Sequence, residues 1–335
     1  MERLLTGRAS RFVRRGFVPL SVVIRASDSP GAPEVLEACR HFAGGCELEL
    51  LVTPEGPGEE ARNRAAQAAR YDHVLFLDPE VQPASEDFFR VHASLHSAHP
   101  ETYFAVMGGV TWPGRHDTGV MLSPGYLLRR GQSPDTEPVP FTFLDYRYLS
   151  DSNFSVKKSV VRDWITEGFR PEFSAALGGV ELAWRLSRRP PGLRILYDPT
   201  ALACHRRAWS LPDAMERQRV VGGLLRRLVD QHPEIAEDLD LPAGSEGQGD
   251  LEYAAILDGV QAWARILDSG AGPGNQPWRR DFQSVALEVC LLHGFVSAQP
   301  DGGVPAGAGA RILERFWRRL RQSLHAELAT PAVHG

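Results

Sequence analysis

Lysine and cysteine are both scarce in this chain of 335 residues. Its only lysines are Lys157 and Lys158, so almost all of the basic charge is carried by arginine. The four cysteines form no C-x-x-C pair and lie mostly among apolar residues. This pattern predicts reduced cysteines with a packing role, and it argues against a disulfide framework or a zinc site.

Long apolar runs and an excess of one charge sign are absent too. No run approaches the roughly 20 apolar residues that span a bilayer, and no signal peptide is visible, so the predicted location is the cytoplasm. The net charge of -5 gives no reason to expect nucleic acid as a partner. Hydrophobic and charged fractions of 43% and 24% are typical of a soluble chain, long enough for a large domain and a smaller one.

The first half of the chain alternates strand and helix patterns. Short apolar runs predict strands at residues 20–24, 47–53, 74–77 and 103–110. Helical spacing predicts helices at 33–42, 59–70 and 85–97. A β-α-β-α-β order indicates an α/β fold with a parallel sheet at its centre.

Asp78-Pro79-Glu80 follows the most apolar of these strands, and the chain is organised around it. Acids cannot stay in the core, so they must emerge at the carboxyl end of the strand, where ligands bind in open α/β sheets. Two carboxylates there are suited to hold a divalent metal and leave positions for substrate phosphate. The alternative is a strand followed by a solvated acidic turn, because D-x-E is common by chance.

Three histidines share one face of the helix predicted at 85–97: His92, His96 and His99. Their spacing is compatible with metal binding, but no carboxylate accompanies them on a matching face. We therefore predict a solvated helix face.

The second half of the chain contains a long irregular stretch and then returns to regular patterns. Residues 111–140 are rich in Pro and Gly, a composition typical of a functional loop. Further regular elements are predicted at 149–164, 180–186, 193–197 and 201–207, and the last of these contains His205. Amphipathic helices are predicted at 211–231, 251–268, 281–298 and 310–328.

These patterns predict three parts. Residues 1–16 form a basic arm, 17–240 the main domain and 241–335 a helical extension. The arm is compatible with a solvated or docked segment and with peripheral contact to the inner face of a membrane. The extension is suited to pack on the main domain or on a partner chain, including a second copy in a homo-oligomer.

Taken together, the motifs resemble the bacterial family-2 glycosyltransferases of the GT-A fold. The resemblance covers about residues 19–233 and rests on LSVVI, ARNRAAQAA, VLFLDPE, SNFSVKK, GFRPEF, VELAWRL and a histidine after YDPTALAC. It implies a GT-A fold, in which a Rossmann-like mixed sheet is flanked by helices, here with a helical C-terminal extension.

The resemblance also implies the roles of particular residues. Asp78 would lie by the nucleotide and the metal, Glu80 would be a metal ligand, and His205 would complete the metal site. Nucleotide contacts would come from Asp28, Arg62 and Asn63. The implied cofactor is Mn²⁺ or Mg²⁺, with a nucleotide-sugar donor as co-substrate.

The chain departs from the family at two functional positions. At the end of the second strand, VTPEG stands where the family tends to show an acidic V-D-D-G-S, which leaves Thr53 and Glu55 as weak substitutes. The second departure concerns the catalytic base. The family places a Glu-Asp pair just before the helix that here reads VELAWRL, and its aspartate is the catalytic base; Gly178 and Gly179 stand there. Glu181 is the nearest acid and is our candidate base, although a glutamate in a first turn also stabilises the helix dipole.

Two functions are compatible with these residues. The first is an inverting, metal-dependent glycosyltransferase acting on a hydroxyl of a glycan, a lipid-linked acceptor or a small molecule. The second is a GT-A-like module that binds a nucleotide or a protein partner without turnover. A sugar-phosphate nucleotidyltransferase is disfavoured because RASDSPGAP lacks a Gly-rich loop followed by a basic residue.

Overall fold

The computed structural model describes residues 17–25, 32–53, 58–111, 139–163, 168–173, 176–206, 210–238, 257–262, 264–265 and 277–298. Three predicted features therefore lie outside the described residues: the arm at 1–16, most of the loop at 111–140 and the helix at 310–328. Contacts divide the chain into two compact units, and the boundary falls between Ala208 and Trp209.

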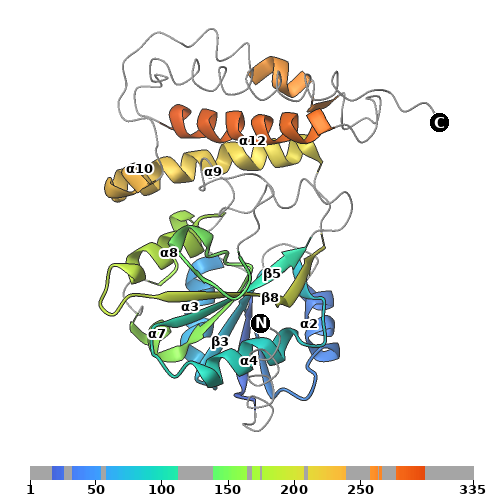
Figure 1. Cartoon of the computed structure of the whole chain (residues 1–335), viewed down its shortest axis with the longest axis vertical. Coiled ribbons are helices and arrows are strands. Elements are labelled where there is room, and N and C mark those ends of the chain that lie inside the picture. Colours follow the sequence, from blue (N-terminus) through green and yellow to red (C-terminus); the bar gives the residue numbers. More distant parts are fainter. Residues whose placement is uncertain are drawn as a thin grey trace, which may run out of the picture. The chain divides into compact units, whose positions relative to one another are not determined.

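The first unit is built on a mixed sheet (Figure 1). Its strands are β1 (Leu20–Ile24), β2 (Leu48–Val52), β3 (His73–Leu77), β4 (Val81–Pro83), β5 (Phe104–Thr111), β6 (Phe143–Leu144), β7 (Asn153–Lys157) and β8 (Arg194–His205). The strand order is β2-β1-β3-β7-β5-β8-β4, and β6 pairs with β8. β1 is parallel to β2 and β3, whereas β7 runs antiparallel to β3 and β5.

Helices cover both faces of this sheet. They are α2 (Ala32–His41), α3 (Gly58–Ala68), α4 (Phe88–Ala98), α7 (Lys158–Asp163) and α8 (Gly178–Ser187), with 3₁₀ turns η1 (Tyr146–Tyr148) and η2 (Pro171–Phe173). Successive strand residues point to opposite faces. Val74 and Phe76 of β3 join the core under α3, α7 and α8, whereas Leu75 and Leu77 join the core under α2 and α4. A mixed sheet flanked by helices is the predicted fold class, which is confirmed.

The second unit is helical. Its longest helices are α9 (Leu211–Gln231) and α12 (Pro277–Ser297), which pack against each other; α10 (Glu234–Asp238) follows α9. The helices cross closely, because a Cβ on Gly222 would lie 1.9 Å from the carbonyl oxygen of Leu291. α9 thus belongs to the helical unit. The three-part division at 16 and 240 stays a prediction.

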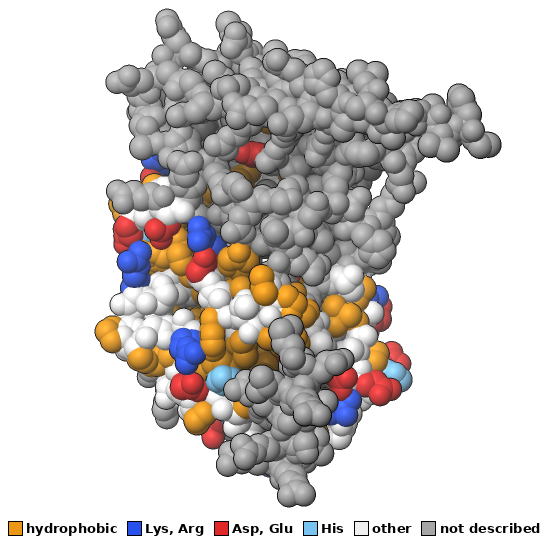
Figure 2. Space-filling model, in the orientation of Figure 1, with side chains coloured by type: hydrophobic (Ala, Val, Ile, Leu, Met, Phe, Trp, Pro, Cys, Tyr) orange, Lys and Arg blue, Asp and Glu red, His pale blue; other side chains and the backbone are white. Residues whose placement is uncertain are grey.

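Surface charge is locally balanced. On the face drawn in Figure 2, acidic and basic side chains of the described residues lie interspersed, with no large patch of one sign. Among the described residues, no helix is long and apolar enough to cross a membrane. All four cysteines are free, and three of them are buried, as predicted.

Candidate active site

The acidic pair after β3 is held in a tight turn. Val74 to Leu77 are completely buried, and Asp78 follows at the carboxyl edge of the sheet. The Asp78 Oδ1 accepts a hydrogen bond from the backbone N–H of Glu80 at 2.9 Å, and its carbonyl accepts one from Val81 at 3.0 Å. This turn directs both carboxylates away from the core.

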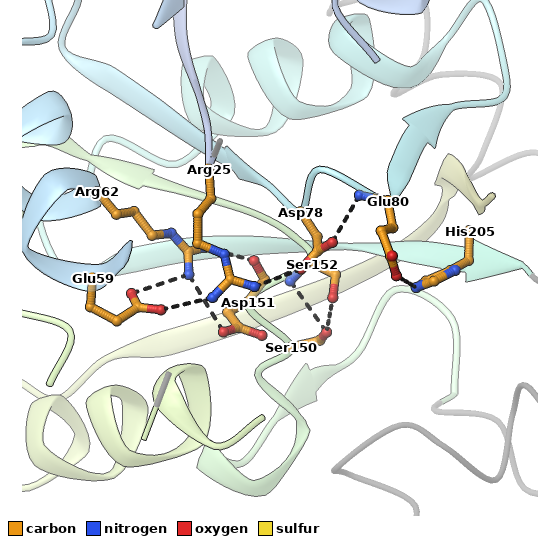
Figure 3. A network of polar contacts seen from close by, with 9 residues as sticks. All are labelled: Arg25, Glu59, Arg62, Asp78, Glu80, Ser150, Asp151, Ser152 and His205. Carbon is orange, nitrogen blue, oxygen red and sulfur yellow. Dashed lines mark hydrogen bonds and ion pairs between the residues drawn. The ribbon is translucent and has the colours of Figure 1, made fainter. Parts of the chain in front are cut away.

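His205 reaches the same edge from the end of β8. β4 pairs with β8 so that Val81 lies opposite His205, and the Arg206 N–H donates to the Glu80 carbonyl at 2.7 Å. As a result, the Glu80 Oε2 lies 3.6 Å from the His205 Nε2 (Figure 3). Residues 125 positions apart in the sequence are brought together, as the metal-site prediction requires.

The Glu80–His205 pair fits a divalent metal only as part of a larger ligand set. Ligands that share a metal at about 2.0–2.2 Å lie roughly 3 to 3.5 Å from each other, close to the observed separation. Among the described residues, however, no group of three or more His, Cys, Asp or Glu side chains is arranged to hold a metal. Two protein ligands completed by water and substrate phosphate are typical of Mg²⁺ sites. The metal itself stays a prediction.

Arg25 links the acidic turn to helix α3. Its guanidinium lies 3.3 Å from Asp78 on one side and 3.3 Å from Glu59 on the other. Burial lowers the pKa of Arg25, but the carboxylates of Asp78, Asp151 and Glu59 outweigh that effect and raise it above its ordinary value. Burial raises the pKa of Glu59, which is completely enclosed.

Arg62 is the buried centre of the same cluster. Only 2% of the residue is exposed, and its guanidinium lies between the rings of Phe76 and Phe169, 4.8 and 4.1 Å from their centroids. It approaches the Glu59 carboxylate at 3.6 Å and the Asp151 Oδ2 at 3.4 Å, and donates to the Asp151 carbonyl at 2.6 Å. We call Arg25, Glu59, Arg62, Asp78 and Asp151 the site network (Figure 3).

Asn63, the neighbour of Arg62, holds a loop. Its amide group donates to the Phe169 carbonyl at 2.9 Å and accepts from the Phe169 N–H at 3.0 Å. A Cβ on Gly168 would lie 2.5 Å from the Asn63 Oδ1, so glycine is required there. Both side chains bind other parts of the protein, Arg62 at Asp151 and Asn63 at Phe169. The nucleotide contacts predicted for them stay predictions. Asp28 lies outside the described residues.

Glu181, the candidate base, is completely buried in α8. Its carboxylate accepts hydrogen bonds from Arg185 at 2.6 and 2.8 Å and lies 3.5 Å from Arg170. These contacts give Glu181 a role in anchoring the helix, and its predicted catalytic role stays a prediction. Gly178 and Gly179 are buried just before it.

Asp151, like Arg25 and Glu59, is a member of the site network that the sequence analysis did not identify as a site residue. Because β7 is antiparallel to β3, with Leu77 opposite Asn153, the residues before β7 lie at the edge where β3 ends. The Asp78 N–H donates to the Ser152 carbonyl at 3.2 Å, which ties the two segments together. The polar run before NFSVK could have revealed Asp151, had the strand been assigned an antiparallel direction.

The solvated face predicted for the α4 histidines is wrong. His92 is completely buried and His96 is 2% exposed, because α4 packs on the sheet through this face. The Ser155 Oγ lies 2.8 Å from the His92 Nδ1 and 2.9 Å from the His96 Nε2, and the Asn153 Oδ1 lies 3.1 Å from the His92 Nε2. We call these four residues the histidine network. The third histidine, His99, stacks on Phe104 with centroids 4.4 Å apart.

Comparison with known proteins gives two short sequence matches, both to Glycogenin-2 from Saccharomyces cerevisiae. Glycogenin-2 from Saccharomyces cerevisiae (strain YJM789) is 33% identical over 75 residues, which cover 22% of this chain and 20% of that protein. No protein-family model matches the chain. The mixed sheet flanked by helices described above is the architecture that the resemblance to the GT-A glycosyltransferases implies.

Solved GT-A structures align with the chain only loosely. A mannosyltransferase from Pyrobaculum calidifontis, in complex with GDP-Man and Mn²⁺, is 14% identical with a TM-score of 0.44, covering 96% of this chain and 92% of that one. Glucosyl-3-phosphoglycerate synthase from Mycobacterium tuberculosis, in complex with phosphoglyceric acid, is 15% identical with a TM-score of 0.42, covering 69% and 83%. Likeness at this level carries no information about individual residues of a GT-A site.

Proposed function

We propose that this chain is an inverting, metal-dependent glycosyltransferase that moves a sugar from a nucleotide-diphosphate donor to an acceptor hydroxyl. The observation that carries the proposal is the approach of Glu80 and His205 to 3.6 Å, next to Asp78, at the carboxyl edge of the sheet. Ligands of open α/β sheets bind at this edge. Glu80 and His205 are 125 positions apart in the sequence, so it is the fold that brings the carboxylate and the imidazole together at this edge.

The charge of the edge favours a donor that arrives with a metal. Side chains of Asp78, Glu80 and Asp151 are 23%, 29% and 15% exposed, and Arg25, at 21%, is the cation that faces Asp78. The carboxylates at this edge outnumber the two guanidiniums, those of Arg25 and Arg62, and the excess of negative charge would repel a free diphosphate. A divalent cation held by Glu80 and His205 would offset that excess.

Each group then has a distinct task. Glu80 and His205 would hold Mn²⁺ or Mg²⁺, and Asp78 would accept hydrogen bonds from the nucleotide. When bound, the metal neutralises the charge that develops on the departing diphosphate. Arg25 would orient Asp78 through their ion pair. Inversion requires an acceptor oxygen that attacks from the face opposite the diphosphate.

Manganese-dependent binding of UDP-, GDP- and dTDP-sugars to the full chain tests the proposal by calorimetry. We expect one donor class to bind only with Mn²⁺, and Glu80→Gln or His205→Gln to weaken that binding at least tenfold. Glu86→Gln is the matched control, because Glu86 is an exposed glutamate six residues from Glu80. Failure of every donor to bind would contradict the proposal.

A second function, donor or partner binding without turnover, is favoured by the glycines at the usual base position and by the engagement of Glu181 with Arg185. It predicts tight, metal-dependent donor binding with no release of nucleoside diphosphate over hours. Measured release above the uncatalysed rate would exclude it. Transfer lost specifically in Glu181→Gln would exclude it as well and would support Glu181 as the base.

A further inference from the structure

Asp151 occupies the space in front of the two glycines at the start of α8. A Cβ on Gly178 would lie 3.5 Å from the Asp151 Oδ2. A Cβ on Gly179 would lie 2.7 Å from the Leu149 carbonyl oxygen and 3.0 Å from the Asp151 backbone nitrogen. A side chain at 179 therefore cannot coexist with the 149–151 segment where it lies. Gly179 therefore allows Asp151 to lie there, whereas a Cβ on Gly178 would make only an ordinary contact.

The carboxylate of Asp151 is held on one side and open on the other. The Oδ2 pairs with Arg62 at 3.4 Å, and the backbone carbonyl is fixed by Arg62 at 2.6 Å. Within the part of the chain that the structure describes, the Oδ1 has no hydrogen-bond partner, and the side chain is 15% exposed. Such a group can accept a proton without breaking the contacts that position it.

Asp151 also lies within reach of the donor edge without belonging to the metal pair. The Ser152 carbonyl accepts from the Asp78 N–H at 3.2 Å, so the two turns move together. In Figure 3, Glu80 and His205 lie on one side of Asp78, and Asp151 lies on the other. A sugar between these two sides would present its leaving group to the metal pair and its opposite face toward Asp151.

We propose that Asp151 is the general base of this protein, acting from the loop before β7 in place of an acid at the start of α8. The inference rests on the proposed glycosyl transfer. The acceptor O–H gives its proton to the Asp151 Oδ1, and its oxygen forms a bond to the anomeric carbon. The bond from that carbon to the diphosphate oxygen breaks, and its electron pair leaves with the nucleoside diphosphate. Arg62, which touches no substrate in this scheme, is a positioning residue.

The test uses the full chain with Mn²⁺ and the donor that binds in calorimetry, with water as acceptor. We expect Asp151→Asn to lower the kcat of nucleoside diphosphate release at least 100-fold, the usual contribution of a general base, with donor Kd changed less than threefold. Asp151→Glu, which restores a carboxylate, is expected to recover at least tenfold over Asp151→Asn. Asp145→Asn is the matched control, since Asp145 caps η1 and pairs with Arg147; its kcat should stay within twofold.

The outcomes separate the inference from the function on which it rests. Normal kcat in Asp151→Asn, or a loss of donor affinity as large as the loss of rate, would overturn Asp151 as the base and leave glycosyl transfer standing. Donor binding without turnover in the wild type would overturn the base while leaving a binding module. No donor binding would overturn both. If Asp151→Asn does not fold, Asp151→Ser, which also lacks the carboxylate, decides: a kcat equal to wild type would overturn the inference, and a kcat at least 100-fold lower at unchanged donor Kd would support it.

Discussion

Two polar networks meet strand β7, and they differ in charge and in depth. The site network lies at the start of the strand and is built from ionised groups. Its members Arg25, Asp78 and Asp151 keep 21%, 23% and 15% of their side chains exposed. The histidine network begins two residues further on, at Asn153, and its four members are 0 to 2% exposed. Neutral groups can be buried completely when each finds a hydrogen bond, whereas buried charges such as Glu59 and Arg62 need a partner of opposite charge.

Each hydrogen bond of the histidine network can be assigned a donor and an acceptor. The Asn153 Nδ2 donates to the carbonyls of Gly109 and Ala201 at 3.0 and 2.9 Å, so its Oδ1 must accept from the His92 Nε2–H. The His92 Nδ1 then accepts from the Ser155 hydroxyl, which in turn accepts from the His96 Nε2–H. Burial lowers the pKa of both His92 and His96, which favours neutral imidazoles in this arrangement. The histidine network ties α4 to β7, whereas the site network leaves a carboxylate oxygen of Asp151 for a ligand.

The largest effect is expected from breaking the site network at Arg62. Arg62→Met leaves the Asp151 carboxylate without its cation and Glu59 with Arg25 alone, and removing one partner of a buried ion pair costs about 4 kcal/mol. We expect the free energy of unfolding in urea to fall by about that amount. Arg64→Met on the same helix removes only an exposed ion pair with Glu60 and should change it by less than about 0.5 kcal/mol. Equal effects of the two changes would contradict the model of a buried ionic centre.

Disrupting the histidine network should lower the free energy of unfolding by a somewhat smaller amount. Asn153→Ala leaves two carbonyls and the His92 Nε2–H without partners, and we expect a loss of about 3 kcal/mol in the free energy of unfolding. Gln82→Ala on the half-exposed edge strand β4 is the control and should cost less than about 1 kcal/mol. A loss in Asn153→Ala no greater than in Gln82→Ala would show that the network does not act as a unit.

The sequence predicted where the acids after β3 lie, next to the site network, but it did not predict the buried histidine network. Asp78 and Glu80 follow a buried strand, so their emergence at the ligand edge could be read from local pattern alone. The pairing of Asp151 with Arg62 depends on the antiparallel direction of β7, which no local pattern encodes. The burial of His92 depends on Ser155 and Asn153, more than 60 residues away. Helical periodicity places the histidines on one face but does not say whether that face meets water or a polar strand.

The two networks should also respond to acid with opposite signs. Burial lowers the pKa of His92 from 6.5 to about 4, so below pH 6.5 the unfolded chain binds a proton that the folded chain does not. The free energy of unfolding therefore falls as pH decreases through that window, by about 2 kcal/mol between pH 6.5 and 5 for this residue. Burial raises the pKa of Glu59, so its contribution is present below pH 4.5 and is lost as pH rises through the folded pKa.

Urea unfolding between pH 7 and 4.5 measures these contributions separately. His92→Gln should flatten the acid loss relative to wild type, and Glu59→Gln should steepen it. His96, whose pKa is also lowered by burial and by His73, His92 and Lys157, continues to contribute in both variants. Parallel pH curves for His92→Gln and wild type would show that His92 is not buried in its neutral form.

The smallest expected effect is the difference in stability between alanine variants of the two glycines beside the site network. Gly179→Ala places a methyl group 2.7 Å from the Leu149 carbonyl, so the 149–151 segment must shift, at a cost on the order of 1 to 2 kcal/mol. Gly178→Ala meets its nearest atoms at 3.5 Å, an ordinary contact, and replacing glycine in a helix should be neutral or stabilise the protein by about 0.5 kcal/mol. Thermal and urea unfolding of the two variants, identical in composition, test this difference. Equal stability of the two variants would mean that residues 149–151 can shift at little cost. The contact with Arg62 would then not hold the Asp151 carboxylate in a fixed position.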